Sequence, residues 1–438
     1  ATTSEGFRKI IERDKVVLQK VGRGKSYEST LLPLENCLDA LIDYRGKTPE
    51  KTSFGVPLIT AKIIKGGRIE KPTEFIARDN YDSWMRRGIP KAGDVVLTVE
   101  APLGEVAQLG PEKIALAQRV VTLRGKAGLL DNTYLLYLLQ TEEMQAQLKA
   151  RATGTTVLGI KQSELRKVAL NLPPIKMQVS AAATLKALDD RITLLRETNA
   201  TLEAIAQALF KSWFVDFDPV RAKQEGRAPE GMSDATAALF PDSFEESELG
   251  LVPKGWRVGS FADVCIISSG KRPPDRSDTA RDACSIPLYG GAGVMGYTSA
   301  SLFDVPKIVT GRVGTLGKVH IAYPPFWASD NVLVVTPNDK TLFSVVLHWL
   351  RSVDVVALNR GSTQPLLTQR DLGAQPGVIP HSSVVVEFED VVSPLYQQIR
   401  EQEHQAQTLA ALRDTLLPRL ISGQLRLPEA EALIAEST

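Results

Sequence analysis

One short stretch occurs twice in the chain, as GTTVLGIKQSEL at Gly154–Leu165 and as GSTQPLLTQRDL at Gly361–Leu372. The two copies align without a gap at a constant offset of 207 residues. The same offset carries LEAIAQALFKSWF (Leu202–Phe214) onto LAALRDTLLPRLI (Leu409–Ile421), where large apolar residues stay in phase. Self-similarity at a fixed offset is the sequence signature of a repeat architecture. The chain is therefore predicted to contain two copies of one unit, each a globular part followed by a long helix.

The repeat extends upstream once gaps are allowed. RGKTP (Arg45–Pro49) resembles SGKRP (Ser269–Pro273), and VVLTVEAPLGEV (Val95–Val106) resembles IVTGRVGTLGKV (Ile308–Val319). Short β-branched runs between Gly/Pro turns predict strands, and helical stretches are predicted near 134–149 and 343–358. Both globular parts are thus predicted to be mixed α and β. Their strand order cannot be derived from these patterns.

Both long helices carry seam residues at alternating spacings of three and four, which is the pattern of a coiled coil. In the first helix the seam is Leu185, Leu188, Ile192, Leu195, Asn199, Leu202, Ala206, Leu209 and Trp213. In the second it is Val392, Leu395, Ile399, Gln402, Ala406, Leu409, Arg413, Leu416 and Leu420. Because a whole domain separates the helices, antiparallel pairing is geometrically easy. The predicted fold class is α+β, with two pseudo-symmetric mixed α/β domains separated by two long helices that form an antiparallel coiled coil.

Local composition completes the predicted division of the chain. Residues 216–250 are rich in Asp, Glu, Pro, Gly, Ser and Ala, and we expect them to form an extended acidic linker. We expect the C-terminal tail to fray. The predicted segments are a basic N-terminal arm (1–33), the first globular domain (34–174), the central long helix (175–215), the acidic linker (216–250), the second globular domain (251–380), the C-terminal long helix (381–425) and the tail (426–438).

Composition excludes several classes of protein. The chain has 438 residues, and its 43% hydrophobic content is normal for a folded protein. No apolar run approaches the ~20 residues of a membrane helix, and three scattered cysteines do not make a disulfide framework or a zinc site. We expect a cytoplasmic protein. The two globular parts are net basic, which raises the expectation of a polyanionic partner, although the signal is weak by itself.

Two strings mimic catalytic motifs without their chemistry. YPPF (Tyr323–Phe326) resembles a methyltransferase motif, but Tyr323 replaces the polar residue that would hold the target amine. RVGTLGKV (Arg312–Val319) has neither the spacing nor the Ser/Thr of a phosphate loop. The four histidines are isolated from each other and from the cysteines. We expect no catalytic residue and no metal site in this chain.

The chain resembles the DNA-specificity subunit of type I restriction–modification systems. The resemblance rests on LPPIKMQVSAAATLKALDDRI (Leu172–Ile192), ALFKSWFVDFDPV (Ala208–Val220), VPKGWRVGSFADV (Val252–Val264), PLYGGAGVMGYT (Pro287–Thr298), RGSTQPLL (Arg360–Leu367) and LLPRLISGQL (Leu416–Leu425). It covers about Leu34 to Leu427. The first domain departs from the pattern, because it lacks the Pro-Lys-Gly-Trp of Pro253–Trp256 and has Glu100-Ala101-Pro102 where the second has Arg312-Val313-Gly314.

The resemblance implies two target-recognition domains, each reading one half of an interrupted double-stranded DNA site. It implies that the helices set the spacing and dock two modification subunits, which carry S-adenosylmethionine and methylate adenine. A restriction or translocase subunit can join them. This chain would then hold no cofactor and perform no chemistry. Two alternatives stay open: a self-contained DNA methyltransferase, and a coiled-coil scaffold without a DNA role.

Loops that combine Gly with Lys, Arg, Thr or Gln allow close approach to DNA and supply donors to bases and phosphates. We expect DNA contacts from Arg45, Lys47, Thr48, Thr155 and Lys161 in the first domain, and from Lys271, Arg272, Tyr289, Arg312, Lys318, Ser362, Thr363 and Gln364 in the second. The other interpretation of the Gly-Thr-Thr and Gly-Ser-Thr turns is that they only lead into the long helices.

The two long helices end in strongly apolar turns, with more large residues than one seam can cover. We expect Phe210, Trp213, Phe214, Leu417, Leu420 and Ile421 to form two equivalent patches for two copies of one partner. The other interpretation is that these residues pack on the adjacent recognition domain, as any helix end can.

Overall fold

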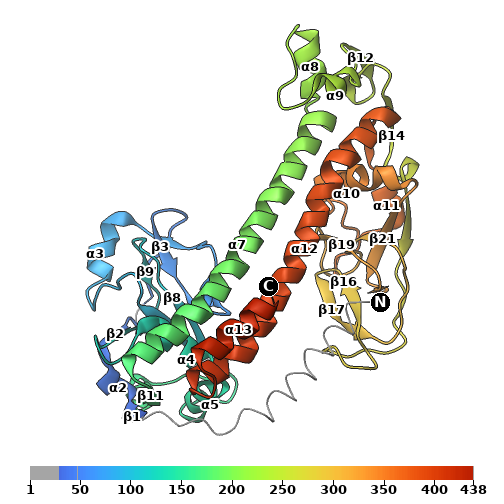
Figure 1. Cartoon of the computed structure of the whole chain (residues 1–438). Coiled ribbons are helices and arrows are strands. Elements are labelled where there is room, and N and C mark those ends of the chain that lie inside the picture. Colours follow the sequence, from blue (N-terminus) through green and yellow to red (C-terminus); the bar gives the residue numbers. More distant parts are fainter. Residues whose placement is uncertain (1–28, 47, 438) are drawn as a thin grey trace. The chain divides into compact units, whose positions relative to one another are not determined.

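The computed structural model describes residues 29–46 and 48–437. The chain divides into two compact units (Figure 1). Unit 1 contains the described residues up to Arg196 and those from His404 onward, and unit 2 contains Glu197–Glu403. Each unit therefore combines one mixed α/β domain with half of each long helix. The predicted fold class is confirmed.

Each unit has a four-stranded antiparallel sheet, and the strand order is the same in both. The order in unit 1 is β2 (Leu38–Asp43), β10 (Val120–Gly125), β7 (Val95–Val99) and β8 (Leu103–Gln108). The order in unit 2 is β15 (Cys265–Ser269), β21 (Val332–Pro337), β18 (Lys307–Gly311) and β19 (Val319–Ala322). The central strands are rich in Val, Leu and Ile because both of their faces are covered.

A smaller three-stranded sheet is also repeated, with one antiparallel and one parallel pair in each copy. Its strands are β6 (Phe75–Ile76), β3 (Val56–Ile59) and β9 (Ala115–Leu116), matched by β17 (Gly293–Thr298), β16 (Ile286–Gly290) and β20 (Trp327–Ala328). A two-stranded pair precedes each long helix, formed by β1 (Thr30–Pro33) with β11 (Ala169–Leu172) and by β14 (Arg257–Ser260) with β22 (Pro376–Ile379). Part of the predicted N-terminal arm is thus a strand, and residues 1–28 lie outside the described part.

Short helices and strands connect these sheets. The helices are α2 (Leu34–Cys37), α3 (Tyr81–Trp84), α4 (Asn132–Gln140), α5 (Glu142–Ala150), α6 (Gln162–Leu165), α10 (Phe343–Ser352) and α11 (Gln369–Gly373), and the strands are β4 (Ile64–Lys65) and β5 (Arg68–Ile69). Helices α4 and α10 are buried nearly all round, because each is part of a core shared with the sheet and the long helix.

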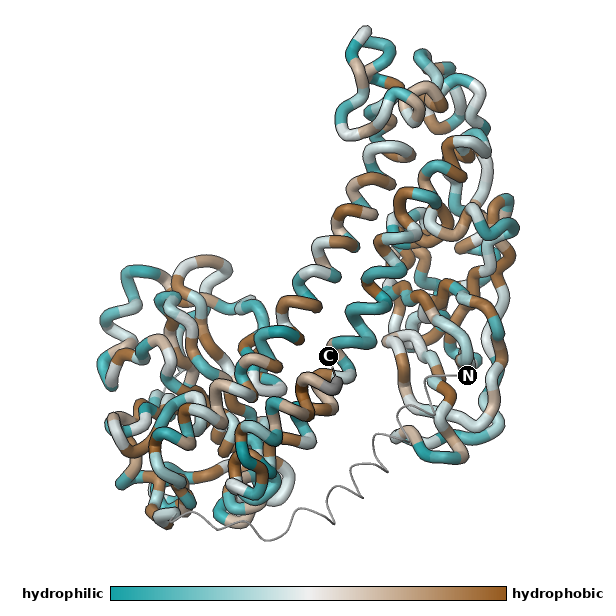
Figure 2. Tube along the Cα trace, in the orientation of Figure 1, coloured by the Kyte–Doolittle hydropathy of each residue, from teal (hydrophilic) through white to brown (hydrophobic). Residues whose placement is uncertain are grey.

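The long helices are α7 (Ile175–Phe214) and α12 (Ser382–Ile421), and they pack antiparallel. In unit 1 the seam residues Leu185 to Leu195 share a core with Ala406, Leu409 and Leu416. In unit 2 the Asn199 side-chain amide donates to the Ile399 carbonyl across the pair at 3.2 Å. Figure 2 shows apolar residues recurring along both helices between polar ones.

The expectation of an extended linker is wrong. The segment 216–250 begins a folded region with α8 (Asp218–Gln224), α9 (Asp234–Ala238) and the hairpin β12 (Phe244–Ser247) and β13 (Gly250–Pro253). Phe217, Val220 and Phe240 from this region are buried in the core of unit 2. Trp213 packs edge-on against Phe240 with ring centroids 5.1 Å apart. The acidic residues lie on the outside of a small apolar core, which composition alone does not reveal.

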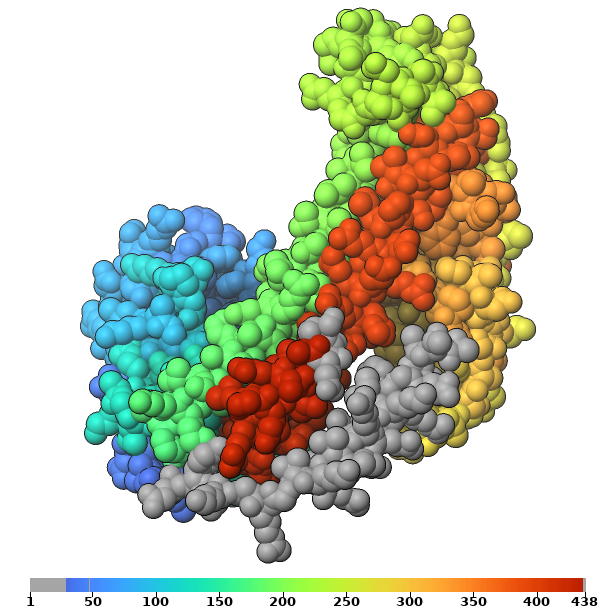
Figure 3. Space-filling view, in the orientation of Figure 1, coloured from blue at the N-terminus to red at the C-terminus, as the bar shows by residue number. Residues whose placement is uncertain are grey.

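The expectation of a frayed tail is also wrong. Leu427–Ser437 form α13, in which Ala430 is fully buried and Leu433 and Ile434 pack on the core of unit 1. Figure 3 shows α13, in dark red, lying against the first part of α7, in green.

Candidate nucleic-acid interface

The repeated Gly-Thr-Thr and Gly-Ser-Thr stretches form the same loop in both units. In unit 1 the loop Thr153–Gly159 is closed by backbone hydrogen bonds from Thr153 N to Gly159 O (2.8 Å) and from Gly159 N to Thr153 O (2.9 Å). In unit 2 the loop Arg360–Leu366 is closed by Arg360 N to Leu366 O (2.9 Å). These closing residues are related by the 207-residue offset found in the sequence.

The glycine that opens each loop is required by a backbone carbonyl. A Cβ on Gly154 would lie 2.1 Å from the Val157 carbonyl oxygen, and one on Gly361 would lie 1.8 Å from that of Gln364. No side chain fits in that space. The loop therefore curls tightly enough to project the residues that follow the glycine, and Thr155–Leu158 and Ser362–Pro365 are all exposed.

Both loops are attached to the end of the same strand. Ile160 N donates to Val99 O at 3.0 Å in unit 1, and Leu367 N donates to Arg312 O at 2.8 Å in unit 2. VVLTV on IVTGR matches Val99 with Arg312, and RGKTP on SGKRP matches Arg45 with Ser269. Glu100 therefore corresponds to Val313 in the structure, one residue after the Arg312 against which the sequence comparison set it. In each unit the matched residues lie beside the loop. We call the loop, together with Val99 and Arg45 in unit 1 or Arg312 and Ser269 in unit 2, the loop frame.

In unit 1 a cavity of about 250 Å³ lies beside this frame and is lined by Arg45, Val99, Glu100, Thr153, Val157, Gly159, Ile160 and Lys161. Arg45 is held by Asp43, with Nη2 and Oδ2 2.5 Å apart, and its Nη1 donates to Ile160 O at 2.7 Å. Its charge is therefore partly neutralised. Lys161 is exposed and forms no ion pair within the described chain.

In unit 2 the frame carries a polar set of side chains. The Ser269 hydroxyl accepts hydrogen bonds from Arg312 Nη1 (3.3 Å) and from Gln369 Nε2 (3.0 Å). Gln364 lies beside Gly314, with Nε2 3.7 Å from the position of a Cβ there. Arg312, Gln364 and Gln369 thus present donor groups within one small area.

The other predicted DNA contacts are placed as follows. Thr48 is exposed and its hydroxyl donates to Gln118 Oε1 at 3.1 Å, and Thr155 is at an exposed loop tip. Lys47 lies outside the described residues. In unit 2, Lys271, Arg272, Lys318, Ser362 and Thr363 are exposed, and none of these three cations forms an ion pair within the described chain.

Tyr289 is half-buried, unlike the exposed residues above. Its ring is packed edge-on against Phe326 with centroids 5.7 Å apart and lies 6.5 Å from His320. Burial raises the pKa of its hydroxyl, with a further contribution from Glu403 on α12. Tyr289 therefore packs with Phe326 on a small apolar cluster beneath the sheets of unit 2.

Sequence reasoning missed several polar residues at the frame. Arg87 Nη1 donates to the carbonyls of Asp43 (3.2 Å) and Arg45 (2.6 Å), which brings a second guanidinium to this end of unit 1. Gln118 and Arg119 lie on the same loop region beside Thr48 and Glu100. Gln369 could have been found, because Gln162 and Gln369 are identical in the repeat.

The model of one protein family, described as the type I restriction modification DNA specificity domain, matches this chain twice, over residues 47–204 and 253–409. The chain belongs to this family. The type I restriction enzyme MjaIX specificity subunit of Methanocaldococcus jannaschii is 28% identical over 414 residues, covering 88% of this chain and 91% of the relative. The HindI specificity subunit of Haemophilus influenzae is 24% identical over 376 residues, covering 72% of this chain and 82% of the relative.

A solved structure shares the fold of this specificity-family chain. The S subunit of the type I restriction–modification system of M. genitalium has a TM-score of 0.59 at 18% identity, covering 92% of this chain and 98% of that one. No helix in the part of the chain that the structure describes is long and apolar enough to cross a membrane. Among the described residues, no group of three or more His, Cys, Asp or Glu side chains could hold a metal ion.

The predicted partner patches of this family member are not exposed. Phe210, Trp213 and Phe214 are 8%, 4% and 7% exposed, and Phe388 of α12 contacts all three rings. Leu420 and Ile421 are 5% and 7% exposed, and Leu417 packs on the same core of unit 1. The expectation of exposed apolar patches at these six positions is wrong, because each helix end is covered by the recognition domain of its own unit.

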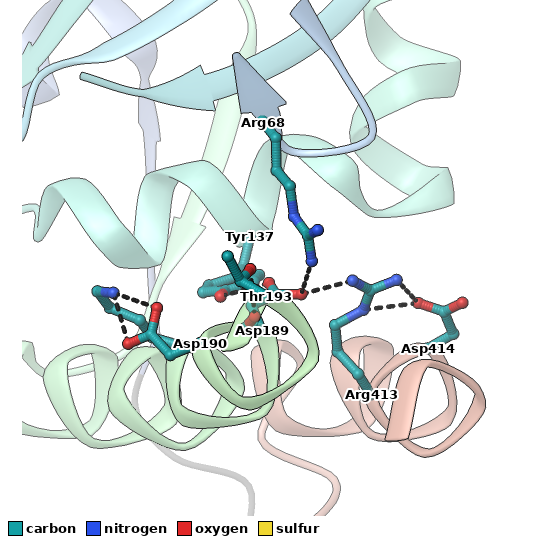
Figure 4. A network of polar contacts seen from close by, with 8 residues as sticks. Arg68, Tyr137, Asp189, Asp190, Thr193, Arg413 and Asp414 are labelled. Atoms are coloured by element: carbon teal, nitrogen blue, oxygen red, sulfur yellow. Dashed lines mark hydrogen bonds and ion pairs between the residues drawn. The ribbon is translucent and has the colours of Figure 1, made fainter. Parts of the chain in front are cut away.

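A polar network joins the long helices to the recognition domain in unit 1 (Figure 4). The Asp189 carboxylate accepts from the Tyr137 hydroxyl (2.8 Å) and from Arg413 Nη1 (2.5 Å), and Arg68 lies 3.7 Å away. The carboxylate on α7 thus meets side chains from three other elements: α4, α12 and β5.

The corresponding position in unit 2 has different chemistry. Tyr396, which the 207-residue offset matches to Asp189, lies with its hydroxyl 3.0 Å from His348 Nε2 and accepts from Arg351 Nη1 at 2.8 Å. Arg351 also binds Glu203 at 2.7 Å. The junction between domain and helix is repeated in position, while its side chains differ.

Tyr323, the first residue of the YPPF string that resembles a methyltransferase motif, packs against the long helix α12. The Arg400 guanidinium lies 4.4 Å from the ring centre of Tyr323, which joins the recognition domain of unit 2 to α12. The ring of Tyr323 is thus occupied by a protein cation.

Proposed function

We propose that this chain is the DNA-specificity subunit of a type I restriction–modification system, in which each recognition domain reads one half of a bipartite double-stranded DNA site. The observation that carries the proposal is the repeated loop, which presents exposed hydroxyl residues at matched positions in both units, Thr155 with Ser362 and Thr156 with Thr363. Each unit adds exposed cations that have no ion-pair partner within the described chain. The names of the related proteins support the same role.

The exposed polar residues of each unit divide by chemistry. Lysines without a carboxylate partner suit phosphate oxygens, which position a protein on DNA but do not specify sequence. Lys161 in unit 1 and Lys271, Arg272 and Lys318 in unit 2 fit this part. The loop-tip residues and the Arg312, Gln364 and Gln369 group suit base edges in a groove. Arg45, which is tied to Asp43, supports the loop more than it offers charge.

The long helices would set the distance between half-sites and dock the modification subunits. Each helix has 40 residues and passes from one unit into the other. An internally duplicated chain offers equivalent surfaces, so two modification subunits would bind, and a restriction or translocase subunit could join them. In this scheme S-adenosylmethionine and adenine methylation belong to those partners, and this chain supplies recognition.

The salt dependence of duplex binding tests the proposal. Lys161→Ala and Lys318→Ala each remove one unpaired cation from a different unit. Neutralising one phosphate contact should lower the slope of log Kd against log salt by about 0.9 for each variant and weaken all sequences alike. Binding is measured between roughly 50 and 200 mM salt on the full chain, purified from its host with any subunits that remain attached.

The matched control is Lys186→Ala. Lys186 is equally a surface lysine, but it lies on α7 and is paired with Asp190 at 2.7 Å. For Lys186→Ala, the slope of log Kd against log salt should equal that of the unaltered protein. If the salt slope were unchanged in both test variants, Lys161 and Lys318 would not contact DNA. If the full chain did not bind duplex DNA, the scaffold alternative would be favoured. Binding of S-adenosylmethionine by the isolated chain would instead favour an enzyme.

A further inference from the structure

One position of the repeated loop combines a fixed backbone with a variable side chain. Val157 and Gln364 are related by the 207-residue offset, and each supplies the carbonyl oxygen that fills the place of a Cβ on the opening glycine. Their backbones are thus held in the same way in both units. The side chains are a branched hydrocarbon in one unit and a carboxamide in the other.

Both side chains point away from the core at the loop tip. Val157 is 48% exposed and the adjacent Leu158 is 41% exposed, which is unusual for large apolar residues on a loop that has no apolar neighbour to cover them. Val157 lines the same cavity as Lys161, which has no ion-pair partner within the described chain, together with Glu100 and the Asp43-bound Arg45. Gln364 is exposed beside Gly314, which follows Arg312 by two residues in the chain.

We propose that residues 157 and 364 are the equivalent base-reading positions of the two recognition domains, with Val157 contacting a thymine methyl group and Gln364 binding an adenine edge. This inference rests on the proposed DNA-specificity function and adds the residues and base classes to it.

The chemistry of the major groove supports the pairing. Thymine is distinguished there by its C5-methyl group, which an apolar side chain recognises, and adenine by its N6 donor and N7 acceptor, which a carboxamide matches with two hydrogen bonds. The flanking cations would hold the adjacent phosphates and bring the loop tip to the bases. A constant frame with an interchangeable tip residue gives the two domains different specificities without a change of fold.

Exchange of the two tips is the test. Val157→Gln, Gln364→Val and the conservative Val157→Thr, which keeps one methyl group, are made in the full chain and purified from the host with any attached subunits. Each protein selects from a library of duplexes with two randomised half-sites, and the bound duplexes are sequenced. Val179→Gln is the matched control, because Val179 is also 48% exposed but lies on α7.

The expected result is a change at one base pair in one half-site for each tip variant. In Val157→Gln, the enrichment of thymine over the other bases at that base pair should fall about tenfold, whereas Val157→Thr should keep most of this enrichment. Gln364→Val should lose adenine in the other half-site, and Val179→Gln should change nothing. Selection of the unaltered motif by both tip variants would overturn the inference, as would uniform weakening on every sequence. If the unaltered protein enriched no motif, the proposed function itself would fail.

Discussion

The two frames show how one backbone arrangement obtains its polar groups from different places. In unit 1 a guanidinium comes from Arg45 after β2, whereas in unit 2 it comes from Arg312 after β18. The residue that matches Arg45 in unit 2 is Ser269, and the one that matches Arg312 in unit 1 is Val99. Residue-by-residue matching of charges therefore fails, although matching of backbone positions succeeds. The loop glycines align between the two copies because their role is steric, whereas Arg45 and Arg312 were each proposed separately and do not align with one another.

His348 is a buried histidine in the core of unit 2. Its ring is 2% exposed and stacks on Phe210 with centroids 5.5 Å apart. Burial, with a smaller contribution from Arg351, lowers the pKa of His348 to about 3. The folded protein therefore keeps His348 neutral while the unfolded chain, with a pKa near ~6.5, takes up a proton.

We predict that this histidine makes unit 2 acid-sensitive. Above pH ~6.5 His348 is neutral in both the folded and the unfolded chain, and its ionisation does not affect the free energy of unfolding. As the pH falls from ~6.5 toward about 3, the unfolded chain alone takes up the proton, so the free energy of unfolding decreases by at most about 1.4 kcal/mol per pH unit. His348→Gln can still reach Tyr396 but does not titrate. Urea unfolding from pH 7.5 to 4.5 should give a flatter curve for this variant, while exposed His404→Gln should follow the unaltered protein. Parallel curves for His348→Gln and the parent would contradict the assignment.

At the scale of elements, the helix ends explain the difference between sequence and structure. The surplus of large residues at Phe210–Phe214 correctly indicated a second contact besides the seam. The interpretation as an exposed docking patch was wrong, because α10 and the folded segment after Phe217 supply the covering surface. Those elements are distant in sequence, so the amphipathic pattern of one helix cannot identify them. The seam itself was predictable, because its periodicity is local.

The junction of helices and recognition domain in unit 1 depends on Asp189 and Arg413. Their side chains are 24% and 21% exposed, so water screens the pair incompletely. We predict a coupling free energy of about 1–3 kcal/mol in a double-mutant cycle of Asp189→Asn and Arg413→Gln. The measurement is chemical unfolding of the full chain, followed by a probe in unit 1.

The ion pair of Lys186 with Asp190 is the control, and Figure 4 labels Asp190 beside Asp189. Its side chains are 50% and 63% exposed, and a cycle of Lys186→Met and Asp190→Asn should give less than about 0.5 kcal/mol. Equal coupling in the two cycles would mean that the Asp189 network contributes no more than a surface ion pair.

For the whole molecule, the repeat was the most informative property of the sequence. It predicted two domains of the same kind and two long helices, because duplication leaves a constant offset along the chain. It did not give the sheet order, in which the edge strand β2 pairs with β10 rather than with its neighbour in sequence. It also did not reveal that residues 216–250 fold, since Phe217, Val220 and Phe240 form their core with residues from distant segments.

The last prediction concerns the spacing between half-sites. Arg196 and Glu403 are matched by the 207-residue offset and are the last residues before the unit boundaries in α7 and α12. Inserting seven residues, one coiled-coil heptad, after Arg196 and after Glu403 keeps the apolar seam of each helix in phase. An insertion of four residues would instead rotate the seam by about 40°. Seven helical residues add about 10 Å, close to three base pairs of duplex. The selected motif should keep both half-sites and lengthen its gap by about three base pairs. An unchanged gap, with folding and binding intact, would show that the helices do not set the spacing.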